Sequence, residues 1–123
     1  MLWRMSTRKA AAAPADRVAA YDRLVADVPD VERKGASMPY TAVNGNMFSY
    51  LDASGAMALR LAATDRAAFI ERFGTRLHDA YGIVQKEYVT VPAAVLDDTD
   101  LLLPWFRASH AYARTLKPKP SRR

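Results

Sequence analysis

Two histidines are the residues of this chain best suited to proton transfer or metal binding. His78 and His110 lie far apart in the sequence, and neither has a second histidine or a carboxylate three or four residues away. Asp79 follows His78 directly, but successive side chains of a strand point to opposite faces. The spacing therefore predicts ordinary surface histidines, not a general base or a metal ligand.

Three aspartates, Asp97, Asp98 and Asp100, form the only acidic cluster that could suggest a cation site. No glycine and closing glutamate follow at the spacing that a calcium-binding loop requires. Acidic residues are also favoured at helix N-termini, where they cap free N–H groups and oppose the helix dipole. The cluster therefore predicts the start of a helix.

Other catalytic patterns are missing from the sequence. The chain has no cysteine, which excludes disulfides, thiolate nucleophiles and cysteine-bound zinc and suits a reducing cytoplasm. Its five glycines are dispersed, so no phosphate-binding loop is formed, and no serine occupies a Gly-x-Ser-x-Gly elbow. We expect a protein that is not an enzyme and that holds no cofactor and no metal.

The elements that would position these side chains begin with a helix and a hairpin. Apolar residues recur with helical spacing over residues 15–27, and Pro29 ends the pattern. Asn44-Gly45 predicts a type I′ turn, because both central positions of that turn need positive φ. The turn joins a first strand ending at Val43, bent near Gly35 and Pro39, to a second strand over Asn46–Leu51.

The second half of the chain predicts further strands and two helices. After a turn at residues 52–55, a third strand spans 56–62, and Thr64 caps a helix that Gly74 ends. A short strand within 76–85 and a strand over 87–91 follow, and Pro92 ends the latter. The last helix runs to about Leu116. Its expected buried stripe is Leu101, Trp105, Ala108, Tyr112 and Leu116. The fold class is α+β, in the order α-β-β-β-α-β-β-α, with one largely antiparallel five-stranded sheet and helices packed on it.

The expected register of the hairpins assigns each strand residue to a face of the sheet. A two-residue turn pairs Val43 with Asn46 and Thr41 with Phe48, and the next turn pairs Tyr50 with Met57. Val89 and Val91 are expected in the core. The face expected to pack against the helices carries Thr41, Phe48, Tyr50, Met57, Leu59 and Leu61.

The opposite face is more apolar than a solvent-exposed face needs to be. Aromatic residues and methionine at the centre with basic residues at the rim resemble the composition of a protein interface. We interpret this face as a candidate interface, with a second copy or with another protein. Two alternatives are that the tail or the 76–85 segment folds over it, and that these are scattered exposures. The candidate interface residues are Tyr40, Met47, Leu51, Arg60, Lys86 and Tyr88.

The net charge of +5 lies at the ends of the chain. Eight of the eighteen basic residues fall in 1–13 and 114–123, so residues 14–113 carry ten basic against thirteen acidic residues, a net charge of −3. We expect an N-terminal tail over 1–13, a domain over 14–116 and a basic tail over 117–123. Met5 is an alternative translation start to Met1. No stretch approaches the length of a membrane span, and no secretory signal is apparent, so the expected location is the cytoplasm.

Several short sequence motifs occur in a recognisable order and spacing. They are Val43-Asn44-Gly45-Asn46-Met47-Phe48, Leu59-Arg60-Leu61 with Asp65-Arg66, Lys86-Glu87-Tyr88-Val89-Thr90-Val91-Pro92, and Trp105 with Tyr112-Ala113-Arg114 and Lys119-Pro120. Over about residues 18–120 the chain resembles the TfoX/Sxy N-terminal domain family. The resemblance implies a secretion-chaperone-like α+β domain, related in outline to YjbR-like proteins.

The founding members of that family are bacterial regulators of natural competence, in which this domain precedes a second one that this chain is too short to hold. The family offers no catalytic residue to carry over. The resemblance therefore implies a non-catalytic regulatory or protein-interaction domain of undetermined pathway. An accessory DNA-binding protein, which makes weak contacts through its basic tails, is the alternative. A small-ligand binder or enzyme with an unrecognised pocket is the third hypothesis.

Overall fold

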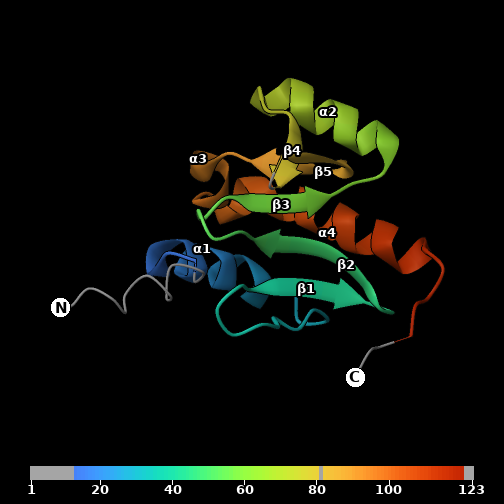
Figure 1. The fold of residues 1–123 in the computed structure, drawn as a ribbon, viewed down its shortest axis with the longest axis horizontal. Helices are drawn as coiled ribbons and strands as arrows, with labels where there is room; N and C mark the ends of the chain where they lie inside the picture. The colour runs from blue at the N-terminus through green and yellow to red at the C-terminus, as the bar shows by residue number, and fades with distance from the viewer. Residues whose placement is uncertain (1–12, 81, 121–123) are drawn as a thin grey trace.

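The computed structural model describes residues 13–80 and 82–120 and has the predicted α+β architecture (Figure 1). Most of the predicted N-terminal tail and the end of the basic tail lie outside the described residues. The elements are α1 (Ala15–Ala26), β1 (Tyr40–Val43), β2 (Asn46–Leu51), β3 (Met57–Arg60), α2 (Ala63–Phe73), β4 (Leu77–Ala80), β5 (Ile83–Val91), α3 (Ala93–Leu96) and α4 (Thr99–Thr115).

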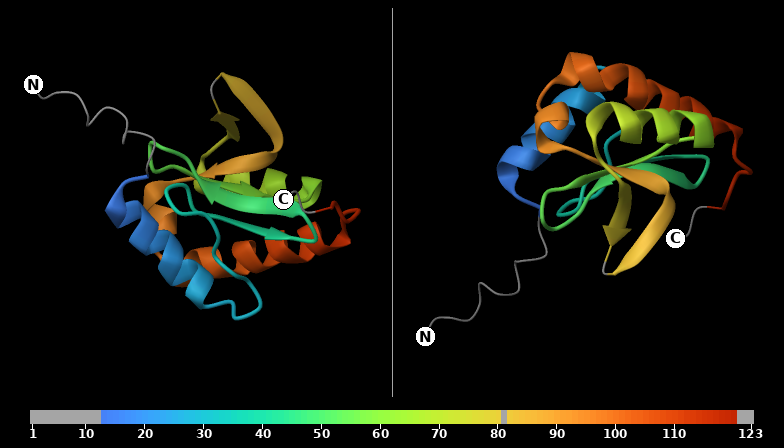
Figure 2. Two further views of the ribbon diagram at one scale, coloured as in Figure 1. Left: turned by 60° about the horizontal axis from the view of Figure 1, so that its bottom comes forward. Right: turned by 90° about the horizontal axis from the view of Figure 1, so that it is seen from above.

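One five-stranded antiparallel sheet has the strand order β1-β2-β3-β5-β4. The helices lie on one side of this sheet, and the β4–β5 hairpin projects from the other side (Figure 2). Strand β5 is four residues longer at its start than predicted, because it continues into this hairpin. The short helix α3 was not predicted. It follows Pro92, whose fixed φ suits the start of a helix.

The predicted turn at Asn44-Gly45 is confirmed. Asn44 has φ 54° and Gly45 has φ 78°, and Val43 pairs with Asn46 across the turn. Beyond the turn, the predicted register is wrong. Ala42 pairs with Met47 but Thr41 pairs with Ser49, so Phe48 is an extra residue in β2. Such a β-bulge reverses the alternation of faces beyond it.

The bulge changes which residues of β2 enter the core. Phe48 and Ser49 are both fully buried, and Leu51 is fully buried as well, although we predicted Leu51 on the opposite face. Tyr50, predicted in the core, lies on the opposite face. Leu51 pairs with Met57, one position away from the expected partner. The assignment of Leu51 to the candidate interface is therefore wrong.

The last helix buries a different stripe from the one predicted. Its buried residues are Leu102, Phe106, Ser109 and Ala113, each one position beyond a predicted residue. Trp105 is half-buried because it packs at the flank of the stripe, edge-on to Phe69 of α2 at 5.2 Å. The acidic cluster does start α4, where the Asp98 side chain accepts a hydrogen bond from the Leu101 N–H. Thr64 does not cap α2, whose N-cap is Ala62.

Candidate functional site

The side of the sheet away from the helices is the surface on which the predicted interface residues were placed. We call it the open face. Strand pairing brings together two neighbouring lines of side chains, one on the β1–β2 hairpin and one on β3 and β5. The open face consists of Tyr40, Ala42, Met47, Tyr50, Ala58, Arg60, Tyr88 and Thr90.

The β4–β5 hairpin covers one half of the open face. The Tyr50 ring lies edge-on to the rings of His78 and Tyr88, at 5.7 Å from each. The Tyr50 hydroxyl donates a hydrogen bond of 2.6 Å to the Gln85 side chain, and Ala58 beneath is fully buried. For this half, the alternative in which residues 76–85 fold over the face is correct.

His78 is buried, which corrects its prediction as a surface histidine. The side chain is 3 % exposed, with Nδ1 at 2.8 Å from the Thr90 hydroxyl and Nε2 at 3.4 Å from a carboxylate oxygen of Asp52. The other oxygen of Asp52 accepts bonds from the N–H groups of Ser54 and Ala56 in the β2–β3 turn. The Thr90 hydroxyl is the hydrogen-bond partner of Nδ1, whereas Nε2 has no hydrogen bond among the described residues and only lies close to the Asp52 carboxylate. These two contacts place the hairpin against the β2–β3 turn.

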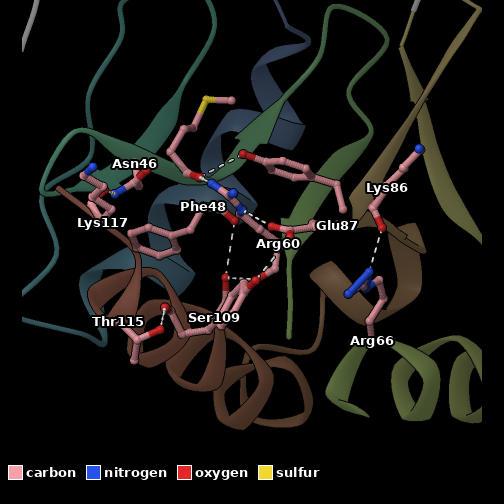
Figure 3. A network of polar contacts seen from close by, with 12 residues as sticks. Asn46, Phe48, Arg60, Arg66, Lys86, Glu87, Ser109, Thr115 and Lys117 are labelled. Atoms are coloured by element: carbon pink, nitrogen blue, oxygen red, sulfur yellow. Dashed lines mark hydrogen bonds and ion pairs between the residues drawn. The ribbon is translucent and has the colours of Figure 1, made fainter. Parts of the chain in front are cut away.

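Arg60 is bonded within the sheet and does not form a free basic rim. Its Nε donates to Glu87 at 2.8 Å and its Nη1 to the Met47 carbonyl at 3.3 Å (Figure 3). The Tyr88 hydroxyl donates to the same carbonyl at 2.8 Å. The hydrogen bond from Arg60 lowers the pKa of Glu87 despite the opposing effect of burial, and the Tyr112 hydroxyl of α4 also donates to that carboxylate.

The other half of the open face continues into a cleft of about 660 Å³ beside β1. Figure 2 shows the chain after α4 passing around the β1–β2 turn towards this side. The Lys119 N–H donates to the Asn44 carbonyl at 2.8 Å, and the Asn46 side chain donates to the Lys117 carbonyl at 3.0 Å. The cleft is lined by Lys34, Tyr40, Ala42, Asn44, Gly45, Met47, Lys119 and Pro120.

Two large apolar side chains are exposed at the start of β5. Ile83 is 69 % exposed and Val84 is 51 % exposed, at the tip of the projecting hairpin. These exposed side chains were not predicted, because the sequence of residues 76–85 indicates a short strand and a loop. An adjacent Ile-Val pair directly after Gly82 is the signal that could have indicated an exposed hairpin tip.

The structure thus separates the six predicted interface residues. Tyr40 and Met47 line the cleft, while Arg60 and Tyr88 contact each other and the Met47 carbonyl. Lys86 is exposed on β5, and its carbonyl accepts a hydrogen bond from Arg66 of α2 (Figure 3). Tyr40 and Met47 in the cleft, and Ile83 and Val84 at the hairpin tip, offer apolar surface to a partner.

The described ranges 13–80 and 82–120 contain no group of three or more His, Asp or Glu side chains placed to hold a metal ion. Within the same ranges, no helix has the length and apolar character needed to cross a membrane.

The comparison with protein families gives one match. The family model described as the TfoX N-terminal domain matches residues 24–113, from the last turn of α1 to the last turn of α4. No curated protein and no solved structure matches the chain.

Proposed function

Because the chain belongs to the TfoX N-terminal domain family, we propose that it is a non-catalytic protein-interaction domain with a regulatory role in the bacterial cytoplasm. The observation that carries this proposal is the exposure of Ile83 and Val84 on a hairpin that projects beside the open face. Large apolar side chains exposed on both faces of a hairpin tip cost solubility and are typical of contact surfaces. Tyr40 and Met47 add a second apolar area, in the cleft beside β1.

The arrangement of the core supports a contact role for this side of the molecule. All helices pack on the other face, so their apolar stripes are already satisfied. The hairpin is held in its projecting position by the buried contacts of His78 with Asp52 and Thr90. A rigid support of this kind lowers the entropy that a partner must overcome on binding.

Site-specific photo-crosslinking in the native host tests the proposal. A photoreactive amino acid is placed at Ile83 or Met47, and at Ala94 as a control exposed on α3. We expect protein adducts from positions 83 and 47 and none from 94. An adduct of twice the chain mass identifies a second copy, and any other mass identifies a different protein. No adduct from 83 or 47 would contradict an interaction role for this side.

A second candidate function, accessory DNA binding, is favoured by one specific observation. Arg114, Lys117 and Lys119 are exposed in succession where α4 ends and the chain passes round the β1–β2 turn. Clustered cations of this kind bind phosphate groups without sequence preference, and their affinity falls steeply with salt. This function would share Lys119 with the cleft that the first one uses, because the basic segment and the cleft meet at the β1–β2 turn.

A further inference from the structure

On the outer edge of β1, the backbone groups of Ala42 lie between those of Tyr40 and Asn44, which are both hydrogen-bonded to other segments. The N–H and C=O of Tyr40 are bonded to Lys34 at 3.0 and 2.9 Å, so these groups point away from β2. Since a strand repeats every two residues, the N–H and C=O of Ala42 point to the same edge. Beyond Ala42, the Asn44 carbonyl accepts a hydrogen bond from the Lys119 N–H. Among residues 13–80 and 82–120, no segment bonds to the backbone of Ala42 on this edge.

The cleft of about 660 Å³ lies along this edge. Its lining includes Ala42, Tyr40 and Met47, together with Lys34, which is bonded to Tyr40, and Lys119, which is bonded to Asn44. Both lysines are exposed. Among the described residues, Lys34 has a single ion pair, at 3.8 Å with the exposed Glu32, and Lys119 has none.

We propose that this cleft binds an extended acidic peptide segment of a partner protein, which adds as a strand to the edge of β1. The partner's backbone bonds to the N–H and C=O of Ala42, and its acidic side chains lie near Lys34 and Lys119. Tyr40 and Met47 contact the apolar side chains between them. This inference rests on the proposed interaction function and names the chemistry of the partner.

The chemistry of the edge favours a peptide over the other occupants. A phosphate backbone only accepts hydrogen bonds, so it would leave the Ala42 carbonyl without a donor. A second copy paired through β1 would bring the lysines of two like clefts to one interface, where like charges repel. An acidic strand supplies both a donor and an acceptor as well as the opposite charge.

A library of random eight-residue linear peptides, panned on the full chain, tests the proposal. We expect enriched peptides to carry aspartate or glutamate together with alternating β-branched residues. In a ¹⁵N NMR titration, an enriched peptide should shift the Ala42 amide and slow its hydrogen exchange. The proposal is overturned if no sequence is enriched, if the enriched sequences lack acidic residues, or if they leave Ala42 unchanged.

Matched variants separate the two recognition elements. Lys34→Glu combined with Lys119→Glu should weaken an enriched peptide by about tenfold or more, because it replaces attraction by repulsion. Ala42→Pro removes the donor and should abolish binding, whereas Ala42→Val keeps the N–H and should retain it. If the charge reversals leave the affinity for the peptide unchanged, the partner does not need acidic residues and the proposal is wrong. This test does not depend on whether the proline variant folds.

Three outcomes distinguish failure of this inference from failure of the proposed interaction function. If random-sequence duplex DNA shifts the Ala42 amide and no peptide does, the cleft is a nucleic-acid site and the proposal is wrong. If no peptide reaches Ala42 but the crosslinks from Ile83 persist, only this inference fails and the proposed interaction function stands. Loss of both contradicts the two together.

Discussion

At the scale of single residues, the core contains a chain of buried hydroxyl groups. The Tyr21 hydroxyl lies 2.5 Å from the Ser49 hydroxyl, which lies 2.5 Å from that of Thr41. All three side chains are fully buried. Because each hydroxyl can donate one bond and accept others, the three satisfy one another and connect α1 to the β1–β2 hairpin.

Burial raises the pKa of Tyr21 from 10.0 to about 12. Between these values the unfolded chain loses the Tyr21 proton while the folded chain keeps it, so the free energy of unfolding must fall as pH rises above 10. A tyrosinate titration at 295 nm should show one of the six tyrosines ionising near pH 12 or only on unfolding.

The Tyr21→Phe variant provides the control for this prediction. It keeps the ring in place, removes the ionising group and leaves the Ser49–Thr41 hydrogen bond, at a cost of about 1 kcal/mol. The late ionisation should disappear, and the free energy of unfolding should depend less on pH between 10 and 12. An identical titration curve for the variant, apart from one fewer ordinary tyrosine, would contradict the assignment.

His78 shows what the sequence could not predict at this scale. No carboxylate lies at helical spacing from His78 in the sequence. The carboxylate that His78 contacts belongs to Asp52, in a turn between two other strands. Local spacing reports only contacts within one element. The burial of His78 depends on how two hairpins meet, which a single sequence does not indicate.

At the scale of elements, residue type predicted the Asn44-Gly45 turn, but the β-bulge at Phe48 was not predicted, and the register beyond it was therefore wrong. Asn44-Gly45 specifies its own turn, because few other residue pairs accept positive φ at both positions. The extra residue at Phe48 has no comparable signal, since neither glycine nor proline marks it. One unpredicted residue moved Leu51 from the proposed interface to the core.

Gly45 has a second role besides its backbone conformation. A Cβ added there would overlap the carbonyl of Lys119, which crosses the turn. Gly45→Ala should therefore release the C-terminal segment and cost more than the 1–2 kcal/mol of a left-handed alanine. Hydrogen exchange at the Lys119 amide, which donates to Asn44, should become fast.

Gly82 offers a matched control at almost the same backbone angle. Its φ is 79° against 78° for Gly45, and no described atom beyond its chain neighbours lies within 4 Å of an added Cβ. Gly82→Ala should cost about 1–2 kcal/mol without changing exchange at Lys119. Equal protection of Lys119 in both variants would show that the segment does not depend on Gly45.

At the scale of the whole molecule, the sequence predicted the class of fold and the location of charge. Period-two and helical patterns indicate the type of each element, so the order of strands and long helices followed from them. Protein interaction and DNA binding are harder to distinguish from the sequence, because the apolar residues of the cleft and the basic tail meet at the β1–β2 turn. There, Lys117–Pro120 is both part of the cleft's structure and a source of positive charge.

Deleting residues 117–123 should therefore have two separable effects. The backbone bonds of Lys117 and Lys119 to the turn are lost, which should lower the free energy of unfolding by about 2 kcal/mol. Four cations are also lost, so the net charge falls from +5 to +1. Any affinity for duplex DNA should fall, and its salt dependence should become shallower by roughly one unit of slope per phosphate contact removed.

A variant that keeps the backbone and changes only charge distinguishes these effects. Lys117→Gln combined with Lys119→Gln retains both hydrogen bonds, so denaturant unfolding should match that of the original chain. DNA affinity measured at several salt concentrations should nevertheless fall towards that of the deletion, with a slope reduced by about two. If the deletion leaves DNA affinity unchanged, the tail makes no contact with DNA. If the double variant is as unstable as the deletion, the lysine side chains, and not the backbone bonds, hold the segment on the turn.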